Sequence, residues 1–130
     1  MSGGLTMDTG ALVALERGNR RMAAVWRAAL ARNVPITVPA VVVAEWWRGQ
    51  RGPAARLLDV VHVEALTDAS ARRVGQALAL LTHKRPSIVD AAVVVSAATR
   101  GDVVYTADLD DIWSVRDAVA PSVVVSGVGA

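Results

Sequence analysis

The sequence predicts a three-layer α/β/α domain with a mostly parallel central sheet of four to five strands. Short apolar runs of strand length alternate along the chain with longer amphipathic stretches of helix length. Strands separated by helices imply right-handed crossovers and a sheet that is covered on both faces. The 130 residues fit a single domain, and a content of 53% hydrophobic residues is sufficient for one well-filled core.

The elements follow from these runs in order. The first strand ends near Asp8, which can cap the helix after it, and Pro39 suits the first turn of the helix after the second strand. Strands are expected over residues 5–9, 36–38, 60–63, 103–106 and 122–125. Helices are expected over residues 10–17, 20–31, 40–49, 53–58, 68–81, 87–99 and 110–119.

The composition limits the classes of protein and the kinds of site that this chain can form. No uncharged stretch approaches the ~20 apolar residues of a membrane helix, and no signal-peptide pattern opens the chain, so we expect a cytoplasmic protein. The absence of Cys excludes disulfides and thiolate metal sites, and two His leave little material for a zinc site. Any catalysis must therefore depend on carboxylates.

Four acidic residues fall at, or within about two helical turns of, the same edge of the predicted sheet. Asp8 follows the first strand in MDTGALVAL, and Glu45 interrupts the apolar helix of PAVVVAEWWRG. Asp90 begins the helix of RPSIVDAAVVVSAATRG, and Asp108 follows a strand in TADLDDI. Because ligands of α/β folds bind at the carboxyl ends of the strands, we expect these four side chains to form one site.

Each acid also has an ordinary structural interpretation. Asp8 and Asp108 can cap the helices that follow them, and Asp90 can form a capping box with Ser87. Glu45, in a helix that otherwise reads as buried, can pair with Arg48. The convergence of all four carboxylates favours a site, because carboxylates gathered together repel each other unless a cation joins them.

A site of carboxylates without Cys or His suits hard cations, so Mg²⁺ is the expected cofactor, with Mn²⁺ as the alternative. Such an ion supports hydrolysis of a phosphodiester bond, because it binds the phosphate and makes a bound water acidic enough to attack. A carboxylate that is not fully used as a ligand can orient or deprotonate that water.

Three segments, MDTGALVAL, VVVAEWWRG and PSIVDAAVVVSAATRGDVVYTADLDDI, resemble the PIN-domain ribonucleases, especially the VapC-type toxins of bacterial toxin–antitoxin pairs. The resemblance implies a Mg²⁺- or Mn²⁺-dependent endoribonuclease that is commonly a homodimer and is inhibited by a cognate VapB-like antitoxin. The acidic metal site of the family matches Asp8, Glu45, Asp90 and Asp108. Thr106 matches its small hydroxyl residue, and Asp110 or Asp111 could be an additional participant.

The Trp46-Trp47 pair departs from the single apolar residue that is common in the family. It suggests an unusual wall of the site or an unusual interface, and we expect the antitoxin to cover Trp46, Trp47 and Arg48. The indoles, with those of Trp26 and Trp113, could stack on RNA bases or pack in the core or a dimer interface.

RNA phosphate could be bound by Lys84 and Arg85, which precede a helix on the active edge, and by Arg48, which could equally lie on a solvated face. Two other functions remain open. One is a catalytically silent PIN-like domain that binds protein or RNA. The other is phosphoryl transfer through an aspartyl phosphate, which MDTG weakly suggests, but the second acid that this chemistry needs is replaced by Gly10.

Overall fold

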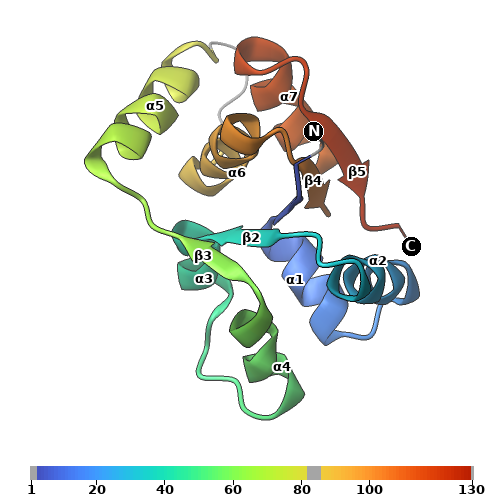
Figure 1. Cartoon of the computed structure of the whole chain (residues 1–130). Helices are drawn as coiled ribbons and strands as arrows, with labels where there is room; N and C mark the ends of the chain where they lie inside the picture. Colours follow the sequence, from blue (N-terminus) through green and yellow to red (C-terminus); the bar gives the residue numbers. More distant parts are fainter. Residues whose placement is uncertain (1–2, 82–85, 130) are drawn as a thin grey trace.

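The central sheet has five strands, and each pair of neighbouring strands is parallel, as predicted. The structure is a computed structural model and describes residues 3–81 and 86–129. The strand order is β3-β2-β1-β4-β5 (Figure 1). The strands are β1 (Leu5–Met7), β2 (Ile36–Pro39), β3 (His62–Glu64), β4 (Val103–Thr106) and β5 (Val124–Gly127).

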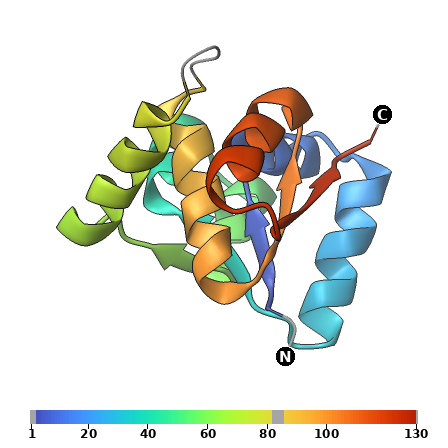
Figure 2. The same cartoon turned by 90° about the horizontal axis from the view of Figure 1, so that it is seen from above.

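Helices cover both faces of this sheet, which gives the three predicted layers (Figures 1 and 2). Helices α5, α6 and α7 lie on one face, and α1, α2 and α3 lie on the other. The bounds are α1 (Thr9–Glu16), α2 (Arg20–Ala31), α3 (Ala40–Trp46), α4 (Pro53–Arg56), a 3₁₀ turn (Leu57–Val60), α5 (Asp68–Ala79), α6 (Ile88–Arg100) and α7 (Leu109–Val119). Among the described residues, no helix is long and apolar enough to cross a bilayer.

The strand order creates a switch point between β1 and β4. From β1 the chain moves outward through β2 to β3, then returns to the other side of β1 to add β4 and β5. The helices that follow β1 and β4 therefore leave in opposite directions, and a crevice opens between them at the carboxyl ends of the strands. This crevice is the place where the fold favours a ligand.

Two boundaries near this crevice differ from the prediction. Strand β1 ends at Met7 because Asp8 is already the cap of α1 and accepts a hydrogen bond from the Ala11 backbone N–H. Helix α3 ends at Trp46, three residues early, because Trp47 is extended and the Gln50 side chain donates to the Trp46 carbonyl, at 3.1 Å. A side chain thus satisfies a carbonyl that a longer helix would have used.

The outer strands also begin later than predicted. Val60 completes the 3₁₀ turn, so β3 starts at His62, and β5 covers Val124–Gly127 where residues 122–125 were expected. Apolar residues in these connections pack against the core without joining the sheet, as Val61 and Val123 do. Hydrophobicity alone therefore could not fix the ends of the two edge strands.

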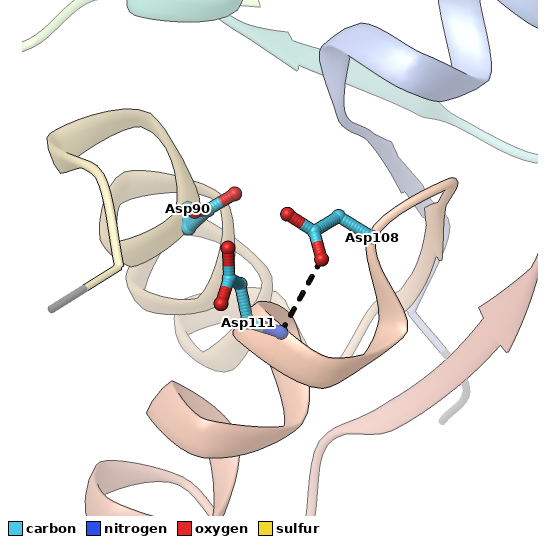
Figure 3. Close-up of side chains that lie close together, drawn as sticks. All are labelled: Asp90, Asp108 and Asp111. Carbon is cyan, nitrogen blue, oxygen red and sulfur yellow. Dashed lines mark hydrogen bonds between the residues drawn. The ribbon is translucent and has the colours of Figure 1, made fainter. Parts of the chain in front are cut away.

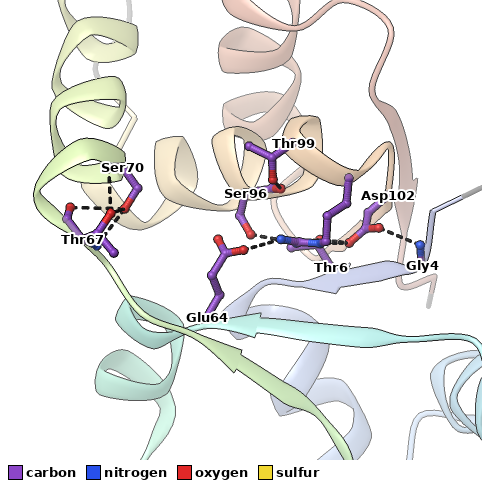
Figure 4. Close-up of polar contacts among 9 residues, drawn as sticks. Gly4, Thr6, Glu64, Thr67, Ser70, Ser96, Thr99 and Asp102 are labelled. Atoms are coloured by element: carbon purple, nitrogen blue, oxygen red, sulfur yellow. Dashed lines mark hydrogen bonds and ion pairs between the residues drawn. The ribbon is translucent and has the colours of Figure 1, made fainter.

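A second polar cluster, the Arg100 network, ties α6 to the sheet away from the crevice (Figure 4). The Arg100 guanidinium donates to Asp102, at 2.9 Å, to Thr6, at 3.0 Å, and to Ser96, at 2.8 Å, and it also pairs with Glu64. Asp102 additionally accepts from the Thr6 hydroxyl, at 2.7 Å, and from the Gly4 backbone N–H, at 2.6 Å. Both carboxylates of the network therefore have a cation, Arg100, within the network.

Candidate active site

The four acids selected from the sequence line one pocket at the switch point. The pocket has a volume of about 110 Å³, and its walls come from the ends of β1 and β4, from α3 and from the first turn of α6. None of its described lining residues is Lys, Arg or His. The lining residues are Asp8, Thr9, Gly10, Glu45, Val89, Asp90, Ala107 and Asp108.

Asp8 is the most buried of the four acids. Its side chain is buried, with 5% of the residue exposed, and caps α1 by accepting from the Ala11 N–H at 2.8 Å. Its other carboxylate oxygen accepts from the Thr106 hydroxyl, and its own N–H donates to the Tyr105 carbonyl at 3.1 Å. Capping a helix and lining the pocket are therefore compatible roles for one side chain.

Thr106 connects the two central strands at their carboxyl ends. Its fully buried hydroxyl donates to Asp8 and accepts from the Asp108 N–H, at 2.8 Å. Asp8 and Thr106 are 98 residues apart in sequence, so this contact depends entirely on the pairing of β1 with β4. Thr106 thereby positions one acid through its side chain and another through its backbone.

Asp90 forms the predicted capping box at the start of α6. Its carboxylate accepts from the Ser87 N–H, and its N–H donates to the Ser87 hydroxyl, both at 3.1 Å. A carboxylate has more lone pairs than one capping bond uses, so the capping box leaves Asp90 able to act as a metal ligand. The structural and functional interpretations again apply to the same residue.

The start of α7 distinguishes the two additional candidates, Asp110 and Asp111. Figure 3 shows Asp111 together with Asp90 and Asp108. Carboxylate oxygens of Asp90, Asp108 and Asp111 all lie within 4.8 Å of one another. Asp108 caps α7 and accepts from the Asp111 N–H at 3.4 Å. Asp110 is exposed and does not belong to this group. The sequence could not choose between Asp110 and Asp111, but the helical turn brings Asp111 to Asp90 and Asp108, in a group that does not include Asp8 or Glu45.

Glu45 lines the pocket but is exposed, so the expectation of a buried carboxylate is wrong. The buried side of α3 carries Val42 and Trp46, and Glu45 lies about 100° from Trp46 around the helix. Its proposed partner Arg48 donates to the carbonyls of Ala44 and Trp47, and no ion pair between Glu45 and Arg48 is found in the described structure.

The environment of the pocket raises the pKa of Asp8, Asp90 and Asp108. Burial raises the pKa of Asp8 from 3.8 to about 6, against the opposing effect of its hydrogen bonds with Thr106 and Ala11. Burial also raises the pKa of Asp90, and the charges of Asp111 and Glu45 add to that effect. Partial burial and the contact with Asp111 raise the pKa of Asp108. The pocket therefore disfavours its own negative charge and favours a cation.

The donor set fits a hard divalent cation. The polar side chains of the lining offer carboxylate and hydroxyl oxygens, which Mg²⁺ and Mn²⁺ prefer. Sequence analysis did not identify Thr9 and Ala107 as part of the site. A clue was their position in the chain, since each is next to an acid of the cluster in MDTG and TADLDD.

The remaining sequence candidates lie elsewhere. Arg48 is exposed and is not among the lining residues, and Lys84 and Arg85 fall outside the described residues. Trp26 and Trp46 are buried in the core, which fits the packing interpretation for both. The Trp46 indole N–H donates to Glu16 at 3.2 Å. The exposed indoles, each with 40% of the residue accessible, are those of Trp47 and Trp113.

A larger groove of about 400 Å³ runs between α5, α6 and the end of α7. Its lining is mostly apolar, with Ala77, Leu80 and Val95 among its residues and Arg73 as the charged one. It contains no carboxylate among the described residues that line it. The smaller acidic pocket is therefore the better candidate for catalysis.

Comparison with known proteins supports the fold. No protein-family model matches the chain, and no curated protein matches its sequence. Among solved structures, VapC20 of Mycobacterium tuberculosis, a toxin that cleaves the sarcin–ricin loop, is 25% identical, with a TM-score of 0.64, over 83% of this chain and 92% of that chain.

Two toxin–antitoxin complexes contain chains of the same fold at lower identity. A chain of FitAcB from Neisseria gonorrhoeae is 19% identical, with a TM-score of 0.69, over 95% of this chain and 97% of that chain. A chain of the DNA-bound VapBC complex from Salmonella typhimurium is 16% identical, with a TM-score of 0.68, over 98% of this chain and 99% of that chain.

Proposed function

We propose that this chain, which has the PIN-domain fold of VapC- and FitB-type toxins, is a Mg²⁺- or Mn²⁺-dependent endoribonuclease that acts as the toxin of a type II toxin–antitoxin pair in the cytoplasm. The observation that carries the proposal is the convergence of Asp8, Glu45, Asp90 and Asp108 on one pocket without a cationic side chain in its described lining. An arrangement of this kind costs stability unless a bound cation offsets the repulsion.

Asp8, Glu45, Asp90 and Asp108 would hold the ion. When bound, the ion would neutralise charge on the scissile phosphate and lower the pKa of a water molecule. The protein itself supplies rigidity, because Thr106 fixes Asp8 and the backbone of Asp108, and Ser87 fixes Asp90. Preorganised ligands of this kind need little rearrangement when the substrate arrives.

The proposal predicts that Asp8→Asn and Asp90→Asn each abolish cleavage of an RNA substrate, and toxicity in cells, while the fold is retained. The losses should not add in the double variant, because residues that act as one unit lose their shared function at the first removal. Asp59→Asn is the matched control, since Asp59 is an exposed acid in the 3₁₀ turn and should leave cleavage unchanged.

Cleavage by folded Asp8→Asn and Asp90→Asn at the rate of the parent would refute the nuclease proposal. RNA binding that persists with no cleavage in any variant or metal would favour the silent binding domain. Binding should weaken as salt rises, because phosphate contacts dominate it. The exposed Arg48 is a candidate for such contacts, as are Lys84 and Arg85 outside the described residues.

We further propose a cognate VapB-like antitoxin as a partner, since several neighbours of the same fold were solved as VapBC or FitAB complexes. A homodimer is proposed on the family resemblance of the sequence alone. Trp47, which is exposed and follows the pocket residue Glu45 by two positions, is the candidate anchor for an apolar side chain of the antitoxin. Trp46 is buried in the core, so its substitution would test stability and not binding.

Trp47→Ala should weaken antitoxin binding by at least tenfold, measured by isothermal titration with the purified antitoxin. Trp113→Ala is the matched control, because Trp113 is equally exposed but lies on α7. Equal affinity of the parent and Trp47→Ala would place the antitoxin on another surface.

A further inference from the structure

Thr9, the first residue of α1, has a buried hydroxyl without a partner. It lines the acidic pocket between Asp8 and Gly10, and among the described residues its Oγ1 is the single buried side-chain polar atom that makes no hydrogen bond. Such an atom has given up the hydrogen bonds that water provides in the unfolded chain. The atom itself has almost no accessible surface, so it can contact a partner in the pocket only after the side chain turns.

The neighbouring hydroxyl of Thr106 shows that this edge of the sheet can satisfy a threonine. Thr106 donates to Asp8 and accepts from the Asp108 N–H, so the protein alone supplies both of its partners. The two carboxylate oxygens of Asp8 already accept from Ala11 and Thr106. Thr9 is not among the donors to Asp8.

We propose that the Thr9 hydroxyl binds a water molecule in the hydration shell of the divalent ion that the four carboxylates would hold. This inference rests on the proposed function. The pocket volume of about 110 Å³ is well above the ~10–15 Å³ that one water molecule requires. A hydroxyl suits this role because it can both donate to and accept from water.

The side chain can reach that position. Thr9 as a residue is only partly buried, and a change of its χ1 rotamer exchanges the hydroxyl with the methyl group. In the metal-free pocket the hydroxyl would turn only toward mobile water, whereas a water bound to the ion is ordered and polarised and is the stronger partner. Mg²⁺ usually keeps several waters in protein sites, so such a partner is available when the ion is bound.

The test uses two substitutions of the full chain. Thr9→Val keeps the shape and removes only the hydroxyl, whereas Thr9→Ser keeps the hydroxyl. We expect Thr9→Val to weaken Mn²⁺ binding about three- to tenfold, measured by isothermal titration without RNA, and Thr9→Ser to remain within about twofold of the parent. In EDTA, Thr9→Val should be at least as resistant to urea as the parent, because it loses an unsatisfied group.

Each result is decisive. Unchanged Mn²⁺ affinity in Thr9→Val overturns the inference, as does equal weakening in Thr9→Val and Thr9→Ser, which indicates packing. Lower urea resistance of Thr9→Val in EDTA overturns it as well, since the hydroxyl then has a partner without metal. Weaker binding of a fluorescent RNA in Ca²⁺ with unchanged Mn²⁺ affinity assigns the hydroxyl to the phosphate instead. A parent protein that binds neither Mn²⁺ nor Mg²⁺ refutes the proposed function itself.

Discussion

The acidic pocket and the Arg100 network contain the same kind of residue in opposite electrostatic settings. Asp8 and Asp102 are both buried, with 5% and 2% of each residue exposed. Asp102 accepts from Gly4, Thr6 and the Arg100 guanidinium, whereas Asp8 is surrounded by other acids and no described cation. A buried carboxylate with its cation nearby is explained by structure, whereas one without a cation is a candidate ligand for a bound ion.

The sharpest test of this contrast is Asp102→Asn. It removes the negative charge that faces Arg100. The three donors to Asp102, from Gly4, Thr6 and Arg100, are then left with one acceptor oxygen in place of two. We expect a loss of about 3–5 kcal/mol in the free energy of unfolding, at the lower end because Glu64 still pairs with Arg100. Urea unfolding measures it. A neutral effect would mean that the network does not stabilise the fold.

The same substitution in the pocket, Asp8→Asn, should have the opposite sign. With a pKa of 3.8 when unfolded and about 6 when folded, Asp8 is protonated in both states at low pH. As pH rises through this window, Asp8 loses its proton in the unfolded chain before it does so in the folded protein. The free energy of unfolding of the metal-free protein therefore falls by up to about 3 kcal/mol, and the decrease is complete above pH 6.

Asp8→Asn should therefore flatten the pH dependence of urea unfolding between about pH 4 and 6 in EDTA, and stabilise the protein at pH 7. Asn has nearly the same shape as Asp, so its side-chain oxygen can still accept the capping hydrogen bond from the Ala11 N–H. Asp117→Asn, an exposed acid paired with Arg116, provides the control profile. A parent whose stability does not fall across this window contradicts the raised pKa.

A divalent metal ion should stabilise the protein through the acidic pocket and not through the Arg100 network. At a hundred times its dissociation constant, Mg²⁺ or Mn²⁺ should raise the free energy of unfolding by about 2.7 kcal/mol. This gain should persist in Asp117→Asn and disappear in Asp90→Asn. A parent protein whose unfolding ignores saturating metal would speak against any ion in the pocket.

The extent of the metal cluster can be refined with two neighbouring acids. Asp111→Asn should weaken Mn²⁺ binding, because its carboxylate lies within 4.8 Å of those of Asp90 and Asp108. Asp110→Asn, one residue earlier and exposed, should not. Isothermal titration compares the two, and equal effects would show that only the general charge of this helix end matters.

The smallest effect concerns packing between the two walls of the pocket. A Cβ on Gly10 would lie 2.4 Å from the Ala107 Cβ and 3.2 Å from its backbone N. Gly10→Ala should therefore push the loop that carries Asp108 away from Asp8, at a cost of about 1–3 kcal/mol. The double variant Gly10→Ala with Ala107→Gly should recover stability and RNA cleavage. Failure of this rescue would show that the contact does not set the spacing.

Much of this protein can be derived from local sequence. The alternation of apolar runs and amphipathic stretches determined the α/β class, because burial on two faces of a parallel sheet imposes that pattern. Asp8, Asp90 and Asp108 were found from their junctions, where capping chemistry and the carboxyl edge of a sheet coincide. These features depend on neighbours within a few residues in the chain.

Other features depend on contacts that no local pattern encodes. The pairing of β1 with β4 brings Thr106 to Asp8 across 98 residues, and the α3 register leaves Glu45 exposed at the pocket. The helical turn after Asp108 selects Asp111 over Asp110. The sequence by itself determined which residue types and junctions could make a site. Only the tertiary structure decided which of them meet, because burial, charge balance and an unsatisfied hydroxyl are properties of packed neighbours.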